Sequence, residues 1–159
     1  MSKPKIVVVP NPHRIAQTQT YVNQLKFDDF LDHARLGDIV IWSGTPGTAP
    51  LWLANCDCIN FLCDLRLTTS AMFKGENDAG MVSCMDQTYE LIARSDDNDQ
   101  IILTEEYQNP GVSVVMKSDV FKSVLHDSLQ SLLWLLPRVL PELPSASYWD
   151  ELVDLFPKP

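Results

Sequence analysis

The chain has little positive charge and no long hydrophobic run. It carries 12 Lys and Arg against 21 Asp and Glu, which gives a formal net charge of −9. A surface that binds nucleic acid or anionic lipid needs clustered Lys and Arg. The most apolar run, residues 132–136, is far shorter than the ~20 residues that span a membrane. We therefore expect neither a nucleic acid nor a membrane as a partner.

The N-terminus lacks the apolar core of a signal peptide. Basic residues stand at its start, but only Ile6–Val9 follow before Pro10, and such a core needs ~7–15 residues. We therefore expect the protein in the cytoplasm. The length of 159 residues and the 45% hydrophobic content predict a single globular domain over residues 1–159.

Common active-site motifs are also missing. The sequence contains no GxGxxG, no P-loop and no Gly-x-Ser-x-Gly elbow. We therefore predict that the protein is not an enzyme and has no cofactor. A cysteine hydrolase stays open as an alternative, with His33 as the base for Cys58 or Cys63, because catalytic partners need not be neighbours in the sequence.

The cysteines follow no zinc-binding pattern, because one, four and twenty residues separate them. A domain of this size can build a core without disulfides, and cytosolic thiols stay reduced. We therefore predict free thiols and no metal site. The cysteines are Cys56, Cys58, Cys63 and Cys84.

Two aspartates, Asp57 and Asp64, interrupt the apolar block that runs from residue 51 to residue 67. A buried aspartate needs a partner, and Arg35 or Arg66 could supply one. We predict a structural ion pair at this place. The periodicity of the block itself leaves strand and helix both open.

Periodicity predicts an α+β fold with a mostly antiparallel sheet. Residues 88–94, 101–107 and 112–117 have strand character, and short polar turns join them, so we expect a meander over about residues 88–117. Earlier strands are expected at residues 5–9 and 38–42.

Helices are expected on one face of this sheet. A long amphipathic C-terminal helix begins with Ser118 as its N-cap, buries Leu129 and Leu132, and ends at Pro137. A shorter N-terminal helix falls within residues 15–36 and ends with Gly37 as its C′ residue. A further short helix is expected over residues 149–156.

Acidic residues are concentrated on the first hairpin of the meander. Residues 86–110 hold seven acidic side chains and one Arg, and so account for six of the nine net negative charges. Such a cluster attracts a basic partner and speeds its association, although solvated turns are also often acidic. An adjacent aromatic ring would anchor the partner. The candidate partner-binding residues are Asp96, Asp97, Asp99, Glu105, Glu106 and Tyr107.

The order of elements over residues 86–136 resembles the small acidic immunity proteins of bacterial toxin systems, including those of contact-dependent inhibition. Strands at 89–94, 101–106 and 112–117 and the Leu-rich helix that follows them carry this resemblance. It implies that the protein binds one cognate toxin, basic and with nucleases among the candidates, and blocks its active site. The alternative is an acidic secretion chaperone, which should be a homodimer with an exposed apolar groove.

Overall fold

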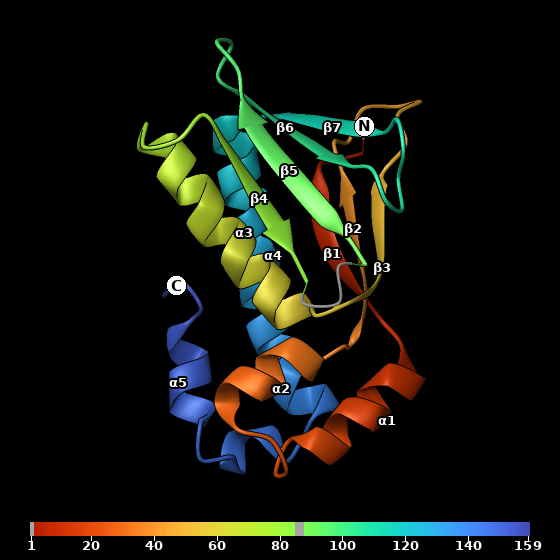
Figure 1. The fold of residues 1–159 in the computed structure, drawn as a ribbon, viewed down its shortest axis with the longest axis vertical. Coiled ribbons are helices and arrows are strands. Elements are labelled where there is room, and N and C mark those ends of the chain that lie inside the picture. The colour runs from red at the N-terminus through yellow and green to blue at the C-terminus, as the bar shows by residue number, and fades with distance from the viewer. Residues whose placement is uncertain (1, 85–87) are drawn as a thin grey trace.

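A computed structural model describes residues 2–84 and 88–159 of the chain. Within these residues, two antiparallel sheets and five α-helices form the α+β fold that the sequence predicts (Figure 1). None of the helices in this part of the chain has the length and apolar character needed to cross a membrane.

The first sheet has the strand order β1-β2-β3, with β1 at Lys5–Pro10, β2 at Gly37–Trp42 and β3 at Leu51–Cys56. Gly37 pairs with Pro10, and a Cβ atom on Gly37 would lie 2.0 Å from the carbonyl oxygen of Val9. The prediction that Gly37 ends a helix is therefore wrong. The residue begins β2, and glycine allows the close approach of β1.

Two helices, rather than one, connect β1 to β2. They are α1 (Pro12–Tyr21) and α2 (Phe27–His33), separated at residues 22–26. The Tyr148 hydroxyl, from the other end of the chain, donates a 2.6 Å hydrogen bond to the carbonyl of Val22 within this break. A contact between residues 126 positions apart thus stabilises the separation of α1 from α2. Local periodicity does not reveal this separation.

The second sheet is the predicted meander with one additional strand. Its order is β4-β5-β6-β7, with β4 at Ala79–Ser83, β5 at Glu90–Ser95, β6 at Gln100–Glu105 and β7 at Ser113–Lys117. The additional strand, β4, pairs with β5 where the sequence indicated the end of a polar loop.

The apolar block at residues 51–67 contains both kinds of structure, because it forms β3 and then the start of α3 (Cys58–Phe73). The long C-terminal helix, α4, covers Ser118–Val139, so the prediction that Pro137 ends it is wrong. A proline this close to the end of a helix removes one backbone hydrogen bond, and only two helical residues follow it, so the helix is not interrupted. Ser118 is the first helical residue rather than the N-cap, which is Lys117.

The helices α3 and α4 cover one face of the second sheet, and α4 also packs against β1. Leu129 and Leu132 of α4 are buried, as predicted. The short helix η1 (Leu143–Ser145) and α5 (Trp149–Asp154) follow α4. Figure 1 shows α1, α2 and α5 together at one end of the molecule, opposite the turn between β5 and β6.

Candidate protein-binding surface

The turn between β5 and β6 carries three of the predicted partner-binding acids. The Asp96 carboxylate accepts hydrogen bonds of 3.0 Å from the backbone N–H groups of Asn98 and Gln100, and Asp99 has a φ of 55°. Aspartate tolerates this left-handed conformation better than most residues. The turn projects beyond the helices at the top of Figure 1, where Asp97 and Asp99 are exposed.

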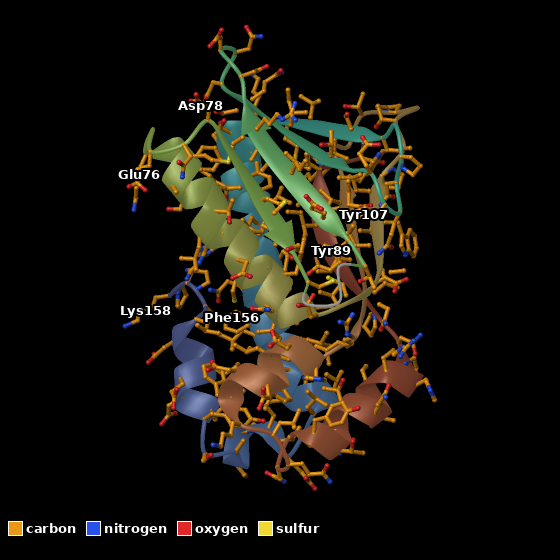
Figure 2. All side chains as sticks on the ribbon, viewed as in Figure 1. Glu76, Asp78, Tyr89, Tyr107, Phe156 and Lys158 are labelled. Carbon is orange, nitrogen blue, oxygen red and sulfur yellow. The ribbon has the colours of Figure 1, made fainter. Side chains whose placement is uncertain are left out.

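Two further aspartates, which the sequence did not indicate, lie beside this turn. The backbone N–H of Ser95 donates to the carbonyl of Asp78 at 3.1 Å, and that of Ser118 donates to the carbonyl of Asp99 at 2.9 Å. These bonds bring the α3–β4 loop and the start of α4 to the turn (Figure 2 labels Asp78). We call the resulting group the acidic tip. It consists of Asp78, Asp96, Asp97, Asp99 and Asp119.

Glu105 does not belong to any binding surface, because its side chain is fully buried. Its carboxylate accepts backbone hydrogen bonds of 2.8 Å from Tyr107 and from Gln108, and bonds of 3.0–3.1 Å from Asn109. Burial alone would raise the pKa of Glu105, but the hydrogen bonds outweigh it and the pKa is lowered. The inclusion of Glu105 among partner-binding residues is therefore wrong. Strand alternation contained the signal, since it places Glu105 on the face of Ile101 and Leu103.

The remaining predicted residues, Glu106 and Tyr107, lie at the opposite end of β6 from the acidic tip. Six strand residues separate the two ends, a distance of about 20 Å. Tyr107 is 61% exposed, and its hydroxyl donates a 3.0 Å hydrogen bond to Glu90. This bond raises the pKa of Tyr107. The predicted residues thus divide between two ends of one sheet, and Figure 2 labels Tyr107 at one of them.

Apolar side chains lie between these two ends on the uncovered side of the sheet, where the exposed Arg94 is opposite Ile102. Met81 is opposite Ile92 on neighbouring strands, and Ile102 is opposite Val115. Met81 is 56% exposed and Val115 is 39% exposed, on the side of the sheet away from α3 and α4. We call these four residues the outer face. Cross-strand apolar pairs at the surface of a sheet are typical of a binding site or of a surface that a partner covers.

A buried polar cluster around Asp57 is the other notable arrangement. The Tyr89 hydroxyl donates to the Asp57 carboxylate at 2.5 Å, and the Asn60 amide donates at 3.4 Å. Burial raises the pKa of Asp57, while the hydrogen bond from Tyr89 and the charge of Arg35 oppose the rise. The predicted partner Arg66 instead donates to the carbonyl of Leu155 at 2.8 Å. The search for an oppositely charged partner indicates only Arg35 and Arg66, so it misses the neutral Tyr89.

The cysteines are poorly placed for nucleophilic catalysis. All four are free and buried. Burial raises the pKa of Cys63 to about 12 and that of Cys56 well above its usual range. His33 bonds through Nδ1 to the carbonyl of Asp29 at 2.7 Å and packs edge-to-face against Tyr21. These features disfavour the thiolate that a cysteine hydrolase needs.

No group of three or more His, Cys, Asp or Glu residues in the described ranges is placed to hold a metal ion. Comparison of the chain with protein-family models, curated proteins and solved structures finds no match. Function is therefore inferred from the surface of the molecule.

Proposed function

We propose that the protein is a binding protein that captures a basic protein domain with its outer face and acidic tip. The partner would be a cognate toxin of bacterial competition, whose active site the bound protein covers. The exposed apolar outer face beside the acidic tip is the observation that carries this proposal. Neither the buried cysteines nor the Asp57 cluster offers an accessible reactive group in its place.

The two parts of this surface would act on different steps of binding. Exposed carboxylates attract a basic domain over long range and raise the rate of association, and this effect decreases with salt. Apolar side chains make contacts only after docking, so they slow dissociation. A nuclease toxin fits this arrangement because its groove must be basic to hold phosphates.

The kinetic test uses the partner that co-purifies with the protein from its native cell. The double variant Asp97→Asn/Asp99→Asn removes two charges from the acidic tip, and asparagine tolerates the left-handed conformation at position 99. We expect the on-rate at low ionic strength to decrease about tenfold, with little change in the off-rate. Met81→Ala/Val115→Ala should instead mainly raise the off-rate.

The matched control is Asp150→Asn/Glu151→Gln, which removes two exposed charges on α5 at the other end of the molecule. Its association kinetics should be close to those of the wild type. An equal on-rate for the tip variant and the control would contradict the role of the acidic tip. A chaperone would behave differently again, because sedimentation would show a stable homodimer and the outer-face variant would dissociate it.

A further inference from the structure

A cavity of about 390 Å³ opens between α3 and α4. Arg66 donates to the carbonyl of Leu155 at 2.8 Å, and the Gln130 side-chain amide donates to the carbonyl of Pro157. These bonds hold the C-terminal segment against both helices, so that Pro157 forms one wall of the cavity. Figure 2 shows this segment beside α3, with Phe156 labelled within it. Three separate segments thus build the cavity.

The cavity gathers positive charge in an acidic protein. Its described lining includes three cationic side chains, Arg66, Lys74 and Lys122, and contains no Asp or Glu. The whole chain has only 12 Lys and Arg against 21 acidic residues. A random arrangement of these charges would therefore not favour a cavity whose charged lining residues are all cationic. Such a wall concentrates ligands of negative charge.

The remainder of the cavity combines apolar side chains with the hydroxyls of Thr69 and Ser70. Phe73, Phe121 and Leu125 line it, and the centroids of the two phenylalanine rings lie 6.2 Å apart. The ammonium group of Lys122 lies 4.2 Å from the centroid of the Phe73 ring. This cation–π contact keeps a positive charge directly beside the apolar wall. Small-molecule sites typically combine apolar walls with a few placed polar groups in a volume of this order.

From this combination we propose that the cavity binds a small organic anion, a carboxylate or phosphate monoester on an alkyl or aryl body. The head group pairs with Arg66, Lys74 and Lys122, and the body packs against Phe73 and Leu125. The site lies on the helical side of the second sheet, whereas the outer face is on the other side. It therefore does not depend on the proposed toxin binding.

The test is an NMR titration of the backbone amides with four probes. Octanoate and octyl phosphate combine head and body, octan-1-ol has the body alone, and inorganic phosphate has the head alone. We expect octanoate and octyl phosphate to shift the amides of residues 66–74 and 121–126 with saturation. Octan-1-ol and inorganic phosphate should each bind at least about tenfold more weakly than octanoate and octyl phosphate, because each lacks one half of the interaction.

The double variant Lys74→Gln/Lys122→Gln identifies the charges responsible. It should weaken octanoate binding about tenfold and leave octan-1-ol binding unchanged. The control Lys26→Gln/Lys117→Gln removes two lysines that do not line the cavity, so it should bind octanoate like the wild type. Thermal midpoints near that of the wild type would show that all variants fold.

Three results would overturn the proposal. One is the absence of saturable shifts around the cavity with both octanoate and octyl phosphate. Another is equal affinity for octanoate and octan-1-ol, which would show a nonspecific apolar contact. The third is an equal loss of octanoate affinity in the cavity variant and the control, which would show that only net charge matters.

Discussion

Glu105 shows how a single residue can look like part of a binding surface and instead organise the chain. Its buried carboxylate accepts hydrogen bonds from the backbone at Glu90, Tyr107, Gln108 and Asn109, and from the Asn109 side chain. A carboxylate suits this site because it offers two oxygens and no donor to the surrounding N–H groups. The side chain thereby determines the path of the chain between β6 and β7.

Glu105→Gln should therefore destabilise the protein by about 2–4 kcal/mol at neutral pH, because the new amide group would face N–H donors. Since folding lowers the pKa of Glu105, its contribution is present above the ordinary value of 4.5 and is lost as the pH falls through the folded value. Urea unfolding between pH 7 and pH 3 should show a weaker acid dependence in the variant.

Glu106→Gln provides the control for this prediction, because Glu106 is an exposed neighbour. It should change the free energy of unfolding by less than about 0.5 kcal/mol across the same pH range. A Glu105→Gln variant as stable as Glu106→Gln at neutral pH would show that the buried hydrogen bonds contribute little.

At the scale of the element, α4 is the part of the fold that sequence periodicity predicts best. Its apolar residues recur at helical spacing, and the stripe that they form is buried against the two sheets. The helix start and end were predicted less well. Lys117 rather than Ser118 is the N-cap, and helix ends are the part of a helix that local signals place least precisely. The helix passes Pro137 because a proline so near the end removes only one of the helical hydrogen bonds.

Leu129→Ala should lower the free energy of unfolding by about 2–5 kcal/mol, because it leaves a cavity where α4 packs into the core. Thermal and urea unfolding measure this effect. Ser131→Ala, at an exposed position of the same helix, should leave the thermal midpoint nearly unchanged. An unchanged midpoint for Leu129→Ala would mean that the helix does not pack as described.

At the scale of the whole molecule, two amide side chains join the sheets. Asn109 accepts from the backbone N–H of Trp52 at 2.9 Å and donates to the Trp52 carbonyl at 3.0 Å. Gln108 accepts from the backbone N–H of Ala54 at 2.8 Å. The β6–β7 loop thus provides hydrogen-bond partners for backbone groups at the outer edge of β3. Without them, this edge would be open to pairing with a strand of another chain.

Asn109→Ala should therefore lower stability by about 2–4 kcal/mol and expose the edge of β3. Hydrogen exchange should become faster at the Trp52 amide than at the amides of β2, because the Trp52 amide loses the Asn109 oxygen that accepts its hydrogen bond. Asn98→Ala, at an exposed position, serves as the control and should leave hydrogen exchange at the Trp52 amide unchanged. Uniform acceleration of exchange in both strands would instead indicate global unfolding only.

The sequence by itself determined the class of fold, the meander and the buried stripe of α4, because these depend on periodicity among residues close in the chain. Only the tertiary structure decided which acidic residues face solvent, since Glu105 is buried by a loop that folds over it. It also brought Asp78 and Asp119 to the turn between β5 and β6, and assembled the cationic cavity from α3, α4 and the C-terminal segment. These surfaces depend on contacts between distant residues, which no local pattern records.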